Sequence, residues 1–518
     1  MSLAIKTNVF SGKESLVIFI TTIVIGLISF VLLYLKDNYS LIYYGDAVSH
    51  LFIARKLVDS ATPGISQIGT VWLPLPHLML LPFSLVDQLY VNGIAGLVVS
   101  LPCHAATSVL IYKIIRNQIG LSHIALIGGF LYASNPNLIY LGITAMTEAP
   151  FLLFFVAFAY YFQKWNYGFN ESENNLKYLF LASFFISLAT LCRYEGWIVA
   201  MVFVSYVSYV IAKSQHIKKH KLSAILISLI AFSGMIFWLG WNQYSYDDPL
   251  EFANSQFYSA SSQAAERTYR DYLYLQPLNV ITIYGMALGM IAGPILLSIA
   301  VIGFVFYFKN KNQRTKLYVF LSLPPVFTII SLFSGIAEMS QWWFNARFAT
   351  LILPFVLVLT AFALAKIVQK NRRIVIPVTI VAVFAFQLFT PMFGVVTFLD
   401  AQAGWTYKQT PYAIEAAEFL RSDYDNGQVM IMTGSSQAHR IMQVSGIHLV
   451  QFDEVIESVI SKPSFMEPWL YDKWLIIGKE PDSDSENAVN YWMERTDILN
   501  QHYSLVFENQ YYKIFLRE

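Results

Sequence analysis

The sequence predicts an all-α polytopic membrane bundle of about eleven transmembrane helices, with a small C-terminal extracytoplasmic α/β domain. Hydrophobic residues fill 56% of the 518 positions and charged residues only 13%, whereas soluble domains carry roughly 25% charged residues. Apolar windows of membrane-spanning length recur up to residue 398, and the hydropathy falls after Leu399. We therefore expect a transmembrane domain over residues 1–398 and an outer domain over residues 399–518.

The first apolar window follows Lys6 and Lys13 and is longer than the core of a signal peptide. No small-residue cleavage site follows it, so we expect an uncleaved signal anchor. The windows on either side of Arg193 are short, which predicts tilted or broken helices. The predicted spans lie near residues 16–36, 92–112, 121–139, 146–164, 176–192, 196–212, 222–241, 280–308, 316–334, 347–366 and 373–395.

Loop charges orient the predicted bundle, because lysine and arginine are enriched in the cytoplasmic loops of membrane proteins. These residues gather in alternate connections, which all lie on one side if the N-terminus is cytoplasmic. The basic connections contain Lys113 and Arg116; Lys213, Lys218, Lys219 and Lys221; Lys309, Lys311, Arg314 and Lys316; and Lys366, Lys370, Arg372 and Arg373.

The opposite side collects a different set of ionisable residues, mostly at the ends of predicted spans. Ionisable groups in or beside membrane segments are costly and indicate functional sites. We therefore expect any active site to be extracytoplasmic. The residues on this side are Asp46, Glu148, Arg193, Glu195, Asp247, Asp248, Glu251, Arg267, Arg270, Glu338 and Arg347.

Net charge and cysteine content argue against other classes of protein. The formal net charge of +1 gives no bulk electrostatic case for binding nucleic acid. Cys103 and Cys192 each lie inside or at the end of an apolar segment, so neither a disulfide framework nor a metal-thiolate cluster is predicted.

The tail after Leu399 has the pattern of an α/β layer, in which strands alternate with helices. The turn GSSQAH follows the first of these strands but lacks the glycine spacing of a phosphate-binding loop. The predicted strands are VMIMTG (429–434), HLVQFD, WLIIGK, SLVFE and YYKIFL, and helices are predicted near residues 437–444, 454–461 and 484–496.

The connection after the first span, residues 44–82, is too polar and too patterned to be a simple linker. Apolar residues after Gly45 recur near the helical period, which predicts a short helix lying on the membrane with Asp46 at its N-terminus. Arg55 falls close to the apolar stripe and would snorkel or face a cavity. Asp46 is either an N-cap or a general base at the mouth of a membrane cavity.

Two further histidines belong to this connection. His50 lies one helical turn after Asp46, so the pair could hold a divalent cation or make a local side-chain contact. The segment GTVWLPLPH (69–77) contains two prolines that disfavour a regular helix. Its Trp72 and His77 are either residues of an interfacial loop or the wall of a sugar or lipid-phosphate site.

Three outer motifs bring charge to the ends of predicted spans. In MTEAP, Thr147 suits a helix cap and Glu148 suits the positive helix end. In CRYEGW, Arg193 and Glu195 form either a structural ion pair or a phosphate-binding guanidinium site. In QWWFNARFATLILP (341–354), Arg347 heads the tenth span after Trp342, Trp343 and Asn345, as a snorkelling arginine or a substrate contact.

These motifs, in the order GDAVSHLFIAR with VWLPLPH, TEAPF, CRYEG and NARF, resemble the GT-C superfamily of integral-membrane glycosyltransferases. The sequence is most similar to the dolichyl-phosphate-mannose–protein mannosyltransferase and lipid A aminoarabinose transferase branch, over about residues 15–365. Many protein mannosyltransferases carry a second acid where this chain has Ala47, which puts a protein Ser/Thr acceptor in doubt. The oligosaccharyltransferase motif WWDYG is absent, since WWFNA at 342–346 does not match it.

The resemblance implies a helical bundle, a first outer loop over residues 37–91, and a polyprenyl- or dolichyl-phosphate-linked sugar donor. It implies that Asp46 is the catalytic base, which takes a proton from an acceptor on a protein, lipid or surface glycan. Arg193 or Arg347, with Arg55 as a further candidate, would stabilise the departing lipid phosphate, and the sugar would be inverted. The other candidate substrate contacts are His50, Trp72, His77, Glu148, Glu195, Trp343 and Asn345.

Two other classes remain open from the sequence. A transporter or flippase of lipid-linked substrates would place polar residues near the bilayer midplane and carry repeat symmetry, which the sequence lacks. If the protein were a non-catalytic receptor, the Asp46 connection and the arginines at the span ends would have no evident function. Release of polyprenyl phosphate from a labelled donor discriminates between these classes and a transferase.

Overall fold

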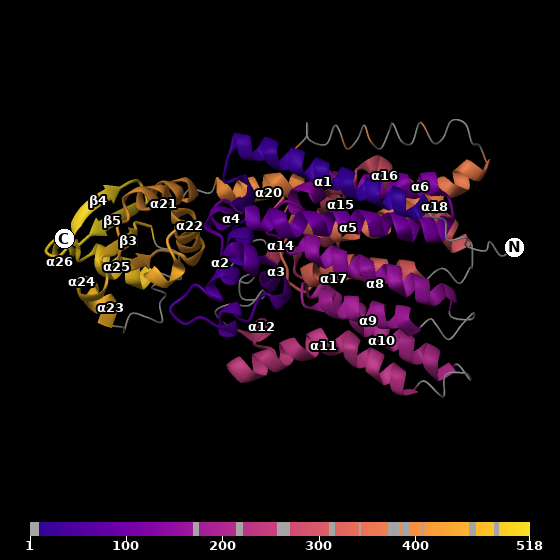
Figure 1. The fold of residues 1–518 in the computed structure, drawn as a ribbon, viewed down its shortest axis with the longest axis horizontal. Coiled ribbons are helices and arrows are strands. Elements are labelled where there is room, and N and C mark those ends of the chain that lie inside the picture. Colours follow the sequence, from indigo (N-terminus) through magenta and orange to yellow (C-terminus); the bar gives the residue numbers. More distant parts are fainter. Residues whose placement is uncertain are drawn as a thin grey trace. The chain divides into compact units, whose positions relative to one another are not determined.

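The computed structural model describes residues 10–168, 176–213, 221–255, 270–309, 316–340, 343–370, 377, 384, 387, 394–406, 409–454, 463–480 and 486–517. The chain forms two compact units. The bundle unit comprises Met1–Leu32, Thr70–Pro76 and Val99–Asp400. The loop-and-sheet unit comprises Leu33–Gly69, His77–Val98 and Ala401–Glu518. Figure 1 shows the helices and the C-terminal sheet.

The bundle unit is built from long apolar helices, and α8 packs against α9, which also packs against α10 and α11 (Figure 1). Its helices are most of α1 (Phe10–Lys36), most of α5 (Ile94–Ile119), α6 (Ser122–Ala133), α7 (Pro136–Leu141), α8 (Glu148–Gly168), α9 (Leu176–Thr190), α10 (Glu195–Lys213), α11 (Lys221–Tyr246), α12 (Glu251–Asn254), α14 (Arg270–Leu273), α15 (Pro277–Ala292), α16 (Pro294–Lys309), α17 (Lys316–Phe333), η6 (Ala346–Ile352), α18 (Leu353–Lys370) and the start of α20 (Val396–Trp405).

Within the described residues, six helices are long and apolar enough to cross a membrane, and a bent pair can supply a seventh span. The six are Gly12–Lys36, Ile94–Ile119, Glu195–Lys213, Ile225–Tyr246, Lys316–Phe333 and Ala346–Val368. The bent pair, α15 and α16, turns by 107° at Gly293, whose φ of 81° is a conformation that glycine adopts readily. The chain is therefore a multi-pass membrane protein.

The number of eleven spans is not confirmed. The window at 121–139 is divided between α6 and α7, because the Asn135 side chain accepts hydrogen bonds from the backbone of Asn137 and Leu138 and starts a new helix at Pro136. The window at 176–192 corresponds to α9, which has only 15 residues. The last window, 373–395, lies almost wholly outside the described residues.

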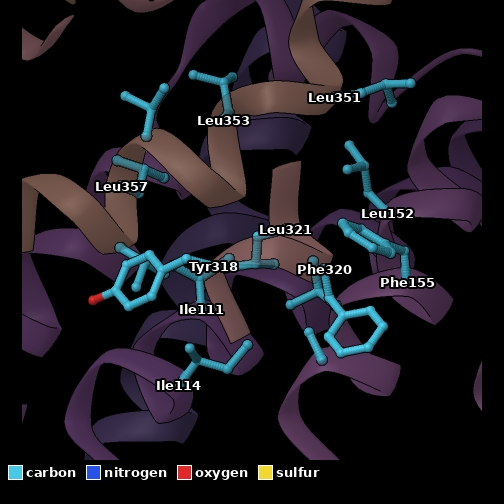
Figure 2. Packing of buried hydrophobic residues seen from close by; sticks show 14 of the residues in the cluster. Ile111, Ile114, Leu152, Phe155, Tyr318, Phe320, Leu321, Leu351, Leu353 and Leu357 are labelled. Carbon is cyan, nitrogen blue, oxygen red and sulfur yellow. The ribbon is translucent and has the colours of Figure 1, made fainter. Parts of the chain in front are cut away.

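Aromatic and aliphatic side chains lock the core of the bundle unit. The ring of Phe320 on α17 lies 4.5 Å from that of Phe162 and 5.5 Å from that of Phe158, both on α8. Figure 2 shows Leu152 and Phe155 of α8 beside residues of α5, α17, η6 and α18. This packing fixes α8, and with it Glu148 at its first residue.

The loop-and-sheet unit contains a five-stranded mixed sheet in the order β2-β1-β3-β5-β4. β1 pairs in parallel with β2 and β3, whereas β5 pairs antiparallel with β3 and β4. Four of the five predicted strand segments contain an observed strand: β1 (Val429–Met432), β3 (Trp474–Gly478), β4 (Ser504–Glu508) and β5 (Tyr512–Leu516). The segment HLVQFD only overlaps β2 (Phe452–Glu454), because Leu449–Gln451 form the 3-10 helix η7. A domain boundary at residue 399 remains a prediction.

Helices accompany the sheet, among them one close to the predicted 437–444. They are α21 (Thr410–Asp423), α22 (Ser435–Ser445), η7 (Leu449–Gln451), α23 (Pro463–Met466), α24 (Pro468–Tyr471), α25 (Glu486–Met493) and α26 (Thr496–Leu499). The helix predicted at 454–461 lies almost entirely outside the described residues, and the one predicted at 484–496 corresponds mainly to α25.

The connection after α1 contributes η1 (Ser40–Ile42), α2 (Gly45–Lys56), η2 (Ile65–Ile68), most of α3 (Pro74–Ser84) and α4 (Asp87–Tyr90). The predicted membrane-surface helix is α2, but seven of its twelve residues are buried in the protein. The ring of Phe52 stacks on His439 of α22 at 3.9 Å, so protein covers the part of the apolar stripe within α2 that we assigned to lipid, whereas Val58 beyond α2 is exposed. The prolines of WLPLPH do not prevent a helix either, because Pro74 and Pro76 occupy the first turn of α3, where proline is tolerated.

Candidate functional site

In the bundle unit, three of the predicted site residues meet at a fully buried carboxylate. Oε1 of Glu148 lies 2.9 Å from Nη1 of Arg193 and 3.3 Å from Nε of Arg347. Glu148 begins α8, Arg193 lies in the turn between α9 and α10, and Arg347 lies at the start of η6. The structure thus brings together three motifs that are far apart in the sequence.

Arg193 also binds Glu195 through two contacts, at 2.7 Å for Nη2 to Oε1 and 3.2 Å for Nε to Oε2. Its Nη1 donates to the hydroxyl of Thr147 at 3.0 Å. The turn is tight because a Cβ at Gly196 would lie 2.8 Å from the carbonyl oxygen of Ala189. The ion pair predicted as the structural alternative is therefore present, and Glu148 extends it.

Arg347 follows a segment with unusual backbone geometry. Trp343 and Asn345 have φ angles of 71° and 56°, which non-glycine residues adopt at a cost. The backbone N–H of Asn345 donates to Asp400 at 3.3 Å, and Asp400 also lies 4.0 Å from Nη1 of Arg347. Strained backbone of this kind is concentrated at functional sites.

Asp400 was missed by the sequence analysis, which used its surroundings only to mark the fall in hydropathy. The available signal was an isolated acid at the end of the segment FGVVTFLD. Because ionisable groups beside apolar segments are costly, Asp400 could have been added to the charged set, but its partner could not have been named.

Trp72 belongs to a loop that is fastened to the CRYEG turn. The hydroxyl of Tyr194 donates to the carbonyl of Val71 at 3.0 Å, and the N–H of Leu75 donates to the carbonyl of Leu191 at 3.1 Å. Trp72 itself is half-buried. The structure therefore joins the VWLPLPH and CRYEG motifs within the bundle unit.

In the loop-and-sheet unit, Asp46 lies in the first turn of α2 and is half-buried. The N-cap position belongs to Tyr44, so the interpretation of Asp46 as the N-cap residue is wrong. A carboxylate in the first turn is stabilised by the positive end of the helix dipole. Asp46 therefore lies where the helix dipole favours a negative charge, at the start of a well-packed helix.

His50 and His77 form a buried pair in the same unit. Nδ1 of His50 lies 2.9 Å from Nε2 of His77, and both residues are almost inaccessible to solvent. One ring must donate and the other accept, so at most one of these two nitrogens carries a proton. Within the described part of the chain, no three His, Cys, Asp or Glu side chains gather in a way that could hold a metal ion.

Arg55 neither snorkels nor opens onto a cavity, contrary to our prediction. Nε lies 2.7 Å from Asp59, Nη1 lies 2.7 Å from Asp87, and the guanidinium lies over the ring of Tyr90 at 4.6 Å. Burial raises the pKa of Asp59, but hydrogen bonds from Arg55 and from the backbone near Val450 lower it further, to below its usual value. The spacing of Arg55 and Asp59, four residues apart, was the signal that sequence analysis overlooked.

Comparison with known proteins identifies the class of fold. The family model described as dolichyl-phosphate-mannose-protein mannosyltransferase matches residues 79–238. No curated protein matches the chain in sequence. The resemblance to the GT-C superfamily is confirmed by this match and by solved structures of GT-C glycosyltransferases with the same fold.

One such structure is ArnT from Cupriavidus metallidurans bound to undecaprenyl phosphate, with a TM-score of 0.56 and 10% identity. The match covers 94% of this chain and 97% of that chain. Another is the archaeal oligosaccharyltransferase AglB from Archaeoglobus fulgidus in complex with an inhibitory peptide and a dolichol-phosphate. Its TM-score is 0.53 at 12% identity, over 96% of this chain and 73% of that chain.

Proposed function

We propose that this protein is a glycosyltransferase that moves a sugar from a polyprenyl- or dolichyl-phosphate donor to an acceptor on the outer face of the membrane. The observation that carries the proposal is the shared fold with ArnT bound to undecaprenyl phosphate and with AglB bound to a dolichol-phosphate. The family match over residues 79–238 and the apolar helices support it. The acceptor is a protein, a lipid or a surface glycan.

Asp46 is the proposed general base. Its carboxylate takes the proton of an acceptor hydroxyl, whose oxygen attacks the anomeric carbon of the donor sugar. The bond from that carbon to the phosphate oxygen breaks as the new bond forms, so the lipid phosphate leaves and the configuration inverts. The position in the first turn of the well-packed helix α2 supports this role, because a base must be held in a fixed geometry.

Arg193 and Arg347 are the proposed ligands of an anionic phosphate in the bundle unit. A guanidinium group remains charged and can bind two phosphate oxygens at once. Glu148 holds both groups and is therefore a proposed positioning residue. Arg55, the third arginine candidate, contacts Asp59 and Asp87 in the loop-and-sheet unit.

A transfer assay in detergent tests the proposal, with a panel of polyprenyl-phosphate sugars as donors. Release of polyprenyl phosphate is followed for the wild type, for Asp46→Asn and for the matched control Asp423→Asn, which alters an exposed carboxylate. We expect turnover in the wild type and the control, and none in Asp46→Asn. Folded wild-type protein that releases no polyprenyl phosphate from any donor would favour a transporter or a receptor.

A further inference from the structure

Helix α22 of the C-terminal segment lies against α2 within the loop-and-sheet unit. His439 stacks on Phe52 in the middle of α2. One turn further along α22, Nε2 of Gln443 donates to the carbonyl of Tyr90 at 2.8 Å. α22 therefore supports α2 and α4 through side chains that come from more than 340 positions away in the sequence.

Arg440 of this helix contacts the chain that leads into α2. Nη1 lies 3.2 Å from the carbonyl oxygen of Ile42, and Nη2 lies 3.4 Å from that of Tyr43. These two carbonyls belong to the chain just before α2. A Cβ placed on Gly45, the residue before Asp46, would lie 3.6 Å from Nη2 of Arg440.

The surroundings of Arg440 are neutral. It is only 2% exposed, and its guanidinium lies 5.2 Å from the ring centroid of Trp405, which in turn stacks on Tyr43 at 4.9 Å. Among the described ion pairs, none joins Arg440 to a carboxylate. Burial lowers the pKa of Arg440 to about 10.

A buried guanidinium without a counter-ion is costly. The cost is understandable if the group fixes the entry to α2, because its planar fork reaches the carbonyl oxygens of Ile42 and Tyr43 at the same time.

We propose that Arg440 is a positioning residue for Asp46, because it fixes the chain that enters α2. The C-terminal segment then takes part in catalysis through α22. This inference rests on the proposed role of Asp46 as the base.

Arg440→Met and Arg440→Lys test the inference, with Gln443→Met as the matched control on the same buried face of α22. Because base positioning affects the chemical step, we expect Arg440→Met to lower kcat by about 100-fold and to leave the donor KM unchanged. Arg440→Lys keeps the positive charge and a hydrogen-bond donor, so we expect its kcat to fall less, by about 10-fold. It still falls because lysine lacks the planar fork that reaches both carbonyls. Gln443→Met should retain the wild-type kcat.

The outcomes separate the two proposals. Wild-type turnover together with an unchanged kcat in folded Arg440→Met overturns the inference and leaves the proposed function standing. If Arg440→Met does not fold, Arg440→Lys decides, because a wild-type kcat in that variant also overturns the inference. Absence of wild-type turnover overturns the proposed function, and the role of Arg440 falls with it.

Discussion

Nε of Arg347 lies 3.3 Å from Oε1 of Glu148, which joins the start of η6 to the first residue of α8. The same carboxylate oxygen binds Arg193, so one fully buried acid holds two guanidinium groups. Removal of this acid leaves two cations facing each other without their shared partner.

We therefore expect Glu148→Ala to lower the free energy of unfolding by about 3–5 kcal/mol, the usual cost of breaking a buried ion pair. Thermal unfolding of the purified protein in detergent measures the effect. Glu494→Gln is the control, because Glu494 is 75% exposed and its ion pair contributes little. Equal melting temperatures in the two variants would contradict the account of Glu148.

Arg193 distinguishes phosphate binding from a purely structural ion pair. Lysine keeps the charge but cannot contact Glu195 through two nitrogen atoms, nor bind a phosphate in that way. We expect Arg193→Lys to raise the inhibition constant of added polyprenyl phosphate by about 10-fold. Glu195→Gln, which keeps the arginine, should raise it far less. Unchanged inhibition in a folded Arg193→Lys variant would remove Arg193 from the phosphate site.

Arg55 contacts two carboxylates that differ in exposure, and their removal should differ in cost. The side chain of Asp59 is 10% exposed and that of Asp87 is 50% exposed. We expect Asp59→Asn to cost about 1–3 kcal/mol of stability and Asp87→Asn less than about 1 kcal/mol. Thermal unfolding of the two variants at pH 7 compares them directly, and the reverse order would refute the assignment.

The C-terminal sheet should become less stable as the pH rises, because Asp472 must then lose its proton. Burial and the nearby Asp453 raise its pKa to about 7, so the folded chain holds this proton more tightly than the unfolded chain. Stability is then greatest at and below about pH 4 and falls by on the order of 3 kcal/mol as the pH rises to about 7. Hydrogen exchange of the β3 amides in the full chain measures this dependence. Asp472→Asn should abolish it, and a persistent pH dependence in that variant would assign it to another group.

Sidedness can be tested with single introduced cysteines, because Cys103 and Cys192 are both buried. Glu494 and Lys213 are exposed, on the C-terminal segment and at the end of α10. A membrane-impermeant thiol reagent should label Glu494→Cys in intact cells and Lys213→Cys only after permeabilisation. Labelling of Lys213→Cys alone in intact cells would invert the proposed topology.

Local patterns predicted local features well. The alternation of strands and helices after Leu399 identified segments that contain β1, β3, β4 and β5 and that overlap β2, and the helical period after Gly45 identified α2. The apolar stripe of α2 showed that something covers this face, but not whether lipid or protein does. Phe52 stacks on His439 from α22, a partner that no periodicity in the connection could name.

The charged residues illustrate the same limit. Outer-end charges could be collected from the sequence, and Glu148, Arg193 and Arg347 do meet. Their pairing with one another, and the contact of Arg440 with Ile42 across 398 positions, depends on the fold and not on spacing. The count of eleven spans is not confirmed, because hydropathy windows do not detect an internal cap such as Asn135 and the last window lies almost wholly outside the described residues.

The most direct test of the central claim is the release of polyprenyl phosphate from a labelled sugar donor by wild-type protein and Asp46→Asn. The account predicts turnover by the wild type and loss of turnover in a folded Asp46→Asn variant. Equal turnover in both would contradict Asp46 as the base and make Glu148 the next residue to test, and folded wild-type protein without turnover would contradict the transferase itself.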